Sequence, residues 1–109
     1  MGLSPEHVRE KVMTRVGAFA ACYQLAEAQE PNLSDQFLVL FEIAPDGSVS
    51  SATIEGGAGH TRLEGCVLRQ ILQLHFEPAD LPTKAAFPFH FKTEAVLLQR
   101  QDWRSLGFG

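Results

Sequence analysis

The chain has 109 residues and is 45% hydrophobic, which suits one modest domain and excludes disorder throughout. Its formal net charge of −4 argues against non-specific binding of nucleic acids, which requires a basic face. No apolar run is long enough to span a bilayer, and the first residues lack a signal-peptide pattern. We therefore expect one folded domain that binds no nucleic acid and does not itself insert into a membrane.

Apolar residues at helical spacing predict a first helix that begins after Ser4 and ends at Glu30. Ser4 is a favourable N-cap, and Pro5 suits the first helical position. Pro31 disfavours helical geometry at Glu30. The buried stripe of this helix should consist of Val8, Val12, Val16, Phe19, Tyr23 and Ala26.

The segment Asp35–Glu55 is predicted to form a β-hairpin around a turn at Ala44-Pro45-Asp46-Gly47. The first strand is apolar on both faces, which is typical of a central strand or of a strand with a second contact surface. One face carries Phe37, Val39, Phe41 and Ile43, and the other carries Leu38, Leu40 and Glu42. In the second strand the alternation slips between Val49 and Ala52, which indicates a bulge or a late start.

A second helix is predicted to begin at Thr61, whose hydroxyl would cap the backbone N–H of Glu64. Its buried stripe should be Leu63, Val67, Ile71 and Leu74. A third strand should start near Ala86, because Phe87, Phe89 and Phe91 alternate with polar residues or proline. Pro88 cannot donate a ladder hydrogen bond, so this strand belongs at a sheet edge.

The predicted order is therefore α-β-β-α-β. This order favours an α+β two-layer sandwich, with a three-stranded antiparallel sheet and two helices on one face. Residues 1–4 would be a leading or linker segment, residues 5–98 the domain, and residues 99–109 a C-terminal tail.

The two cysteines, Cys22 and Cys66, each lie at the edge of a predicted helical stripe. If the two helices pack side by side, the thiols come within bridging distance, and a disulfide implies an oxidising compartment. Two adjacent buried free thiols are the alternative.

The sequence offers little sign of catalysis. The four histidines, His7, His60, His75 and His90, show no metal-ligand spacing, and the acids show no paired arrangement. We expect a non-enzymatic domain without a metal or other cofactor.

Two features point to binding of a protein partner. The second face of the hairpin exposes Leu38 and Leu40, which either a partner or the C-terminal segment would cover. The predicted edge strand, Phe87–Lys92, can accept an added strand through its free backbone groups. The candidate partner-binding residues are Phe87, Phe89, His90, Phe91, Lys92, Leu38 and Leu40.

An ordered series of short motifs runs along the chain. It consists of Cys22-Tyr23, Phe41-Glu42-Ile43 with Asp46-Gly47-Ser48-Val49, Leu63 through Cys66, Phe76-Glu77-Pro78, and Phe87-Pro88-Phe89-His90-Phe91. This series resembles the TonB C-terminal domain. It is most similar to the cysteine-containing branch at the C-termini of myxobacterial gliding-motility proteins (the AgmX/PglI C-terminal type).

The resemblance implies a periplasmic domain of an inner-membrane-anchored protein that couples an energised complex to outer-membrane or periplasmic partners. It also implies that Cys22 pairs with Cys66, and that a partner segment adds to the strand around Phe87–Lys92. The membrane anchor and Pro-rich linker of such proteins are not in the sequence, and the long first helix departs from the family pattern. The alternative is a structural module that self-associates as a homodimer through the Leu38/Leu40 face and the C-terminal segment.

Overall fold

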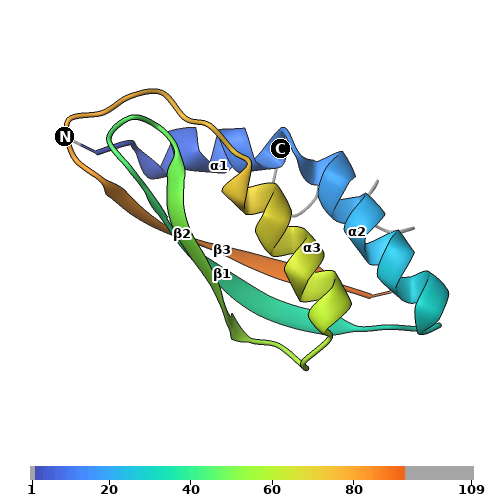
Figure 1. Ribbon diagram of the computed structural model, residues 1–109. Helices are drawn as coiled ribbons and strands as arrows, with labels where there is room; N and C mark the ends of the chain where they lie inside the picture. Colours follow the sequence, from blue (N-terminus) through green and yellow to red (C-terminus); the bar gives the residue numbers. More distant parts are fainter. Residues whose placement is uncertain (1, 93–109) are drawn as a thin grey trace.

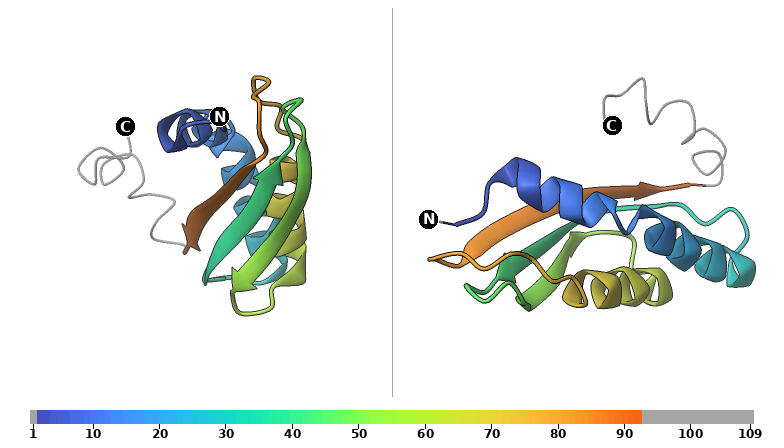
Figure 2. Two further views of the ribbon diagram at one scale, coloured as in Figure 1. Left: turned by 90° about the vertical axis from the view of Figure 1, so that its left-hand side faces the viewer. Right: turned by 90° about the horizontal axis from the view of Figure 1, so that it is seen from above.

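Three helices and three strands make up the computed structural model, which describes residues 2–92. They are α1 (Pro5–Met13), α2 (Val16–Gln29), β1 (Asp35–Ile43), β2 (Val49–Gly56), α3 (Thr61–Leu72) and β3 (Thr83–Phe91). The strands form an antiparallel sheet in the order β2-β1-β3. The helices pack against one face of this sheet (Figures 1 and 2), so the predicted two-layer α+β architecture is confirmed.

The predicted first helix is in fact two helices with a break at Thr14 and Arg15. The Thr14 hydroxyl donates to the carbonyl of Lys11, and Arg15 leaves helical geometry at φ −105° and ψ 15°. Side-chain bonding to a preceding carbonyl is a known cause of helix bending. The break changes the direction of the chain, so that α1 lies near β3 while α2 lies beside α3 (Figure 1).

Both α1 and α3 begin where the sequence predicts, at Pro5 and Thr61, but only α1 has its predicted cap. The Ser4 hydroxyl accepts a hydrogen bond from the backbone N–H of His7. Helix α3 begins at Thr61 itself, with His60 at the cap position and no side-chain cap. Glu64 still reaches back, but its carboxylate accepts from the N–H of Gly59.

The core lies between the sheet and the helices. Alternate residues of β1, from Phe37 to Ile43, are buried there as predicted. Aromatic rings fill its β3 side: Phe89 packs edge-on against Phe19 at 4.9 Å, and Phe91 stacks on Tyr23 at 5.6 Å between ring centroids. These contacts fix β3 firmly under α2.

The Cys22–Cys66 disulfide joins helices α2 and α3. The two Cα atoms are 5.7 Å apart, within the ordinary range for a bridge. The disulfide is therefore confirmed, and the alternative of two free thiols is wrong.

The β1–β2 turn also shapes the sheet. The Asp46 carboxylate accepts hydrogen bonds from both the N–H and the hydroxyl of Ser48. The register between β1 and β2 shifts at Glu42 and Ile43, opposite Val49 and Ser51, which confirms the predicted bulge. Strand β3 begins at Thr83 rather than near Ala86, because its first residues pair with the end of β1.

Candidate protein-interaction site at the β3 edge

Strand β3 is an outer strand, and within residues 2–92 no further strand pairs with its outer side. Its side chains alternate between the two faces of the sheet. Phe87, Phe89 and Phe91 point to the helix layer, and Phe89 and Phe91 are 7% and 6% exposed. The alternate residues, among them Ala86, Pro88 and His90, are exposed on the helix-free face.

Pro88 shows which backbone groups of β3 point outward. It pairs with Leu38 in an unbroken β1–β3 ladder, although it has no N–H to donate. The ladder is therefore best satisfied if the nitrogen of Pro88 faces away from β1. Because backbone groups alternate along an antiparallel strand, Ala86 and His90 also direct their N–H and C=O groups outward.

The beginning of the β3 edge is already in contact with the N-terminal segment. The N–H of Leu3 donates to Thr83 Oγ1 at 2.8 Å, and a Cβ added to Gly2 would lie 2.7 Å from the same oxygen. Helix α1 lies beside this part of β3 (Figure 2). The accessible edge is therefore the second half of the strand, from Ala86 to Lys92.

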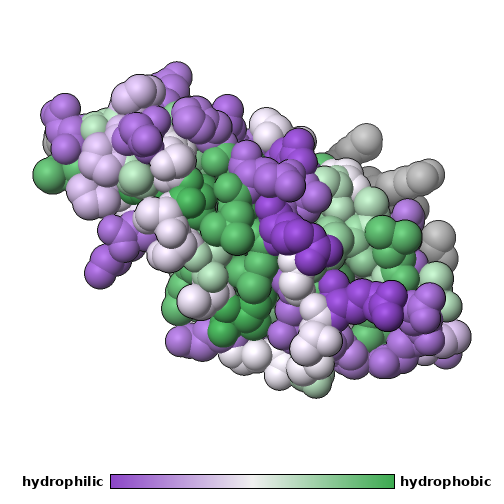
Figure 3. Space-filling view, viewed as in Figure 1, coloured by the Kyte–Doolittle hydropathy of each residue, from purple (hydrophilic) through white to green (hydrophobic). Residues whose placement is uncertain are grey.

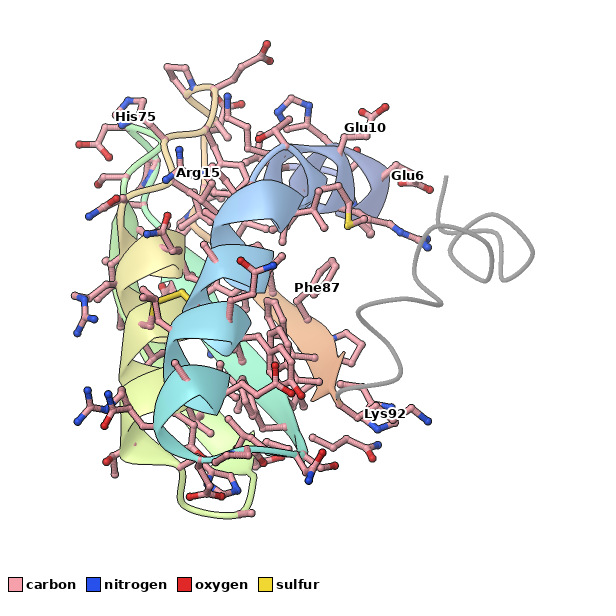
Figure 4. The ribbon with its side chains drawn as sticks, turned by 90° about the vertical axis from the view of Figure 1, so that its right-hand side faces the viewer. Glu6, Glu10, Arg15, His75, Phe87 and Lys92 are labelled. Atoms are coloured by element: carbon pink, nitrogen blue, oxygen red, sulfur yellow. A yellow bond between two sulfur atoms is a disulfide. The ribbon has the colours of Figure 1, made fainter. Side chains whose placement is uncertain are left out.

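The predicted site residues divide by where their side chains lie. Phe87 is partly buried and projects from β3 toward the helices, whereas Lys92 lies beyond the strand and points away from it (Figure 4). His90 and Lys92 are exposed, so both side chains are accessible to a partner. Phe89 and Phe91 are core residues, and their contribution to the edge is to hold it in place.

Leu38 and Leu40 lie on the helix-free face, where both are half-buried. Leu38 is opposite Pro88, and Leu40 is opposite Ala86. Four apolar side chains thus form a small patch directly beside the β3 edge. The sequence analysis also named the C-terminal segment as a cover for Leu38 and Leu40, but that segment lies outside the residues that the structure describes.

Ala86 and Pro88 belong to this site although the sequence-based prediction omitted them as contact residues. The sequence contained this information, because Ala86 and Pro88 alternate with the phenylalanines and therefore share a face of the strand with His90 and Lys92. The prediction selected the large aromatic residues instead, and the structure places two of those in the core.

The site has a basic character on the helix-free face. Lys84, His90 and Lys92 share that face of β3 and are all exposed. The pairing register sets Lys84 opposite Glu42 and His90 opposite Gln36. This arrangement favours a partner segment that presents acidic or polar side chains to this face.

Other kinds of site find little support in the described residues. Among residues 2–92 no group of three potential metal ligands comes together. In the same range, none of the helices combines the length and the apolar character that crossing a bilayer requires. The arrangement suits recognition of a polypeptide by its backbone and by a few side chains.

Comparisons with known proteins agree with the fold. Residues 26–93 match the family described as Gram-negative bacterial TonB protein C-terminal. The solution NMR structure of the Pseudomonas aeruginosa TonB CTD is similar, with a TM-score of 0.50 and 25% sequence identity over 65% of this chain and 75% of that chain. No curated protein sequence matches the chain. Because the family match covers more than half of the chain, this protein belongs to the TonB C-terminal family.

Proposed function

We propose that the domain is a non-enzymatic protein-interaction module of the Gram-negative periplasm, and that it binds an extended segment of an outer-membrane or periplasmic protein along β3. Membership of the TonB C-terminal family supports the cellular context. The observation that carries the binding mode is the accessible edge from Ala86 to Lys92 beside the Leu38/Leu40 patch.

The incoming segment would pair with the outward backbone groups of Ala86, His90 and Lys92. Its side chains on one side would meet Phe87 and helix α1, and those on the other would meet the apolar patch and the basic residues. Pro88 has no backbone N–H to donate, so the incoming segment makes fewer backbone hydrogen bonds here than it would along a regular edge strand. Side-chain contacts must supply the rest of the affinity.

The proposal extends to the whole protein. The Cys22–Cys66 disulfide supports an oxidising compartment such as the periplasm. We propose that the domain is carried by an inner-membrane-anchored protein of a TonB-type energy-transducing or gliding-motility complex, of the AgmX/PglI C-terminal type. A motor complex in the inner membrane would then act on outer-membrane partners through this domain.

Backbone NMR shift mapping tests the edge model directly. The isotope-labelled domain is titrated with synthetic peptides that represent the periplasmic segments of outer-membrane proteins from the same bacterium. We expect the largest shifts at Ala86–Lys92 and at Leu38 and Leu40. Shifts confined to α1 would rule out strand addition at β3.

The alternative is a structural module that self-associates through the Leu38/Leu40 face. The half-buried leucines on the helix-free face favour it. The two functions differ in stoichiometry, because self-association raises the mass with concentration in the absence of any peptide. Substituting Leu38 with Glu would then restore the monomer, which sedimentation velocity detects.

A further inference from the structure

An apolar strip runs along the surface between strand β2 and helix α3 (Figure 3). Its β2 residues pair with the core-facing residues of β1, so they lie on the helix side of the sheet. They are Val49, Ala52 and Ile54, and all three are partly buried. Helix α3 contributes Leu68, which is also partly buried, and Leu72, which is 46% exposed. The helix layer thus leaves apolar side chains accessible along the β2 side of the sheet.

Leu68 and Leu72 face β2 because they follow Glu64 at intervals of four residues and so share its flank of α3. The Glu64 carboxylate accepts a hydrogen bond from the N–H of Gly59 and lies next to Gly57, and both glycines come directly after β2. Helices α1 and α2 lie on the β3 side of α3 (Figure 2). Within residues 2–92 the outer flank of α3 therefore has no helix beside it.

The rim of the strip on α3 is basic. Arg62 and Arg69 are both exposed and are seven residues apart, so they lie on one line of the helix, two turns from each other. The guanidinium of Arg69 lies over Gly65, because a Cβ built on that glycine would be 3.7 Å from Nη1. Among the described residues no carboxylate forms an ion pair with either arginine. Two positive charges without a partner in that part of the chain therefore border the apolar strip.

The strip suits a helix better than an added strand. The start of the β2 edge is occupied, because His75 forms a bridge with Ser48 and the N–H of Phe76 donates to the carbonyl of Gly47. The register then shifts just after Val49, so a regular ladder has room only along the last part of β2. The apolar side chains instead project out of the sheet plane, where a helix beside α3 would contact them.

Gly65 allows the backbone of such a helix to approach α3 closely. It lies on the helix surface between the two arginines and the two leucines, at spacings of three, four and seven residues. Apart from the Arg69 side chain, no atom lies within 4 Å of the Cβ built there. Helix α3 has 12 residues and is about 18 Å long, so three to four turns of a partner helix would cover it.

We propose that this strip binds an amphipathic helix of a partner protein that is acidic on one flank. Apolar residues of that helix pack on Ile54, Leu68 and Leu72. Acidic residues on one flank pair with Arg62 and Arg69. The other flank lies along the β2 edge, whose outward backbone groups suit polar, uncharged side chains. Because β2 and β3 are the two outer strands of the sheet, this surface is separate from the β3 edge, and the domain can hold two partners at once.

Fluorescence anisotropy with a synthetic helix tests the strip directly. The probe is a peptide of about 15 residues, held helical by side-chain lactams because a free peptide of that length is a marginal helix. It has leucines on one face, glutamates on one flank and glutamines on the other. The matched probe has lysines in place of the glutamates. The interface is small, so we expect the acidic probe to bind with a Kd between about 10 μM and 1 mM. At low salt it should bind at least about tenfold more tightly than the basic probe.

One pair of variants tests the apolar contact. Leu72→Glu should abolish binding of the acidic probe, because it places a carboxylate in the strip. The matched control is Leu25→Glu on α2, where the leucine is 67% exposed and lies outside the strip. This variant should bind the probe like the wild type. Equal loss in the two variants would overturn the proposal.

A second pair tests the charges. The double variant Arg62→Glu/Arg69→Glu should reverse the preference, so that the basic probe binds more tightly than the acidic one. The control is Lys84→Glu/Lys92→Glu, which changes exposed charges beside the β3 edge and should leave the preference unchanged. Reversal in both double variants, or in neither, would overturn the proposal. Thermal unfolding of each variant shows that it is folded at the temperature of the measurement.

NMR shift mapping of the wild type with the acidic probe locates the contact. We expect the largest shifts at Ile54, Leu68 and Leu72. Largest shifts along β3, equal affinity for the two probes, or no binding at about 1 mM would overturn the proposal. Shifts of the same residues on dilution without a probe would assign the strip to a second copy of the chain. Nuclear Overhauser contacts with residues 93–109 would assign it to the C-terminal segment, and either result would also overturn the proposal.

Discussion

Pro88 of the edge strand β3 lies directly opposite Leu38 of the central strand β1 in an unbroken ladder. The proline removes one backbone donor from the outer edge, where a bound segment would pair. Replacing it with valine should therefore strengthen binding of a peptide that shifts β3 in the NMR mapping. One recovered hydrogen bond is worth about 0.5–1.5 kcal/mol, so the affinity should rise roughly two- to tenfold.

The converse substitution is His90→Pro, which removes the next outward donor along the same edge. We expect peptide binding to weaken roughly two- to tenfold while the fold is retained, because one outward donor is lost and this N–H does not pair with β1. His90→Ala is the control, since it removes the side chain and keeps the donor. Isothermal titration calorimetry compares the wild type with these two variants. An edge model fails if His90→Pro binds as tightly as His90→Ala.

The Cys22–Cys66 disulfide should contribute strongly to stability because it closes a loop with a sequence separation of 44. The chain-entropy model gives about 4 kcal/mol for a loop of that length. The double variant Cys22→Ala/Cys66→Ala should lose about 2–5 kcal/mol of unfolding free energy in urea denaturation. An unfolding free energy equal to that of the oxidised wild type would show that the bridge constrains nothing.

Thiol titration of the denatured protein without reductant provides a separate check. We expect no free thiol, because both cysteines of the chain are paired. After reduction the same titration should find two.

The order of the elements could be predicted from the sequence because each element has a clear local pattern of apolar residues or turn residues. The alternating phenylalanines of β3 and the Ala44–Gly47 turn have few competing interpretations. The break between α1 and α2 was missed for a physical reason. Thr14 and Arg15 are acceptable helical residues, and the kink depends on the hydroxyl of Thr14 bonding to Lys11.

The candidate site was predicted less well than the fold. Period-two alternation shows that two faces exist, but it does not show which face the helices cover. The prediction therefore placed Phe89 and Phe91 at a partner surface, although both pack against α2. The start of α3 at Thr61 was predicted correctly, but the predicted capping box does not form, because His60 lies at the cap position and Glu64 accepts from the N–H of Gly59.

Gly47 should be the least replaceable of the turn residues. Its φ is +96°, and a Cβ there would lie 2.0 Å from the carbonyl oxygen of Phe76. The N–H of Phe76 donates to the carbonyl of Gly47, which holds the two backbone segments together, so neither can move away without loss of this hydrogen bond. Gly47→Ala should cost more than about 3 kcal/mol of unfolding free energy, above the strain of a left-handed residue alone.

Gly59→Ala is the matched control. Gly59 also has a positive φ, of +83°, but no atom lies within 4 Å of a Cβ built there. Only the conformational strain remains, so the loss should be about 1–2 kcal/mol. Similar losses for the two variants would contradict the close approach of Gly47 to Phe76.

The hydrogen bonds of the β1–β2 turn also predict how the stability of the protein depends on pH. The hydroxyl and then the N–H of Ser48 donate to Asp46, and these hydrogen bonds lower the pKa of its carboxyl below the ordinary value of 3.8. Protons thus bind more tightly to the unfolded chain than to the folded one at this residue. Its contribution to stability is present above pH 3.8 and is lost as the pH falls through the lower folded pKa.

An NMR titration that follows the Asp46 side-chain carbon measures this pKa directly. Ser48→Ala removes the hydroxyl and keeps the N–H, so the pKa should return part of the way toward 3.8. Ser50→Ala is the control, because the Ser50 hydroxyl donates to the carbonyl of Glu42 and not to Asp46. An Asp46 pKa that is the same in the wild type and in Ser48→Ala would show that the hydroxyl does not stabilise the charged carboxylate.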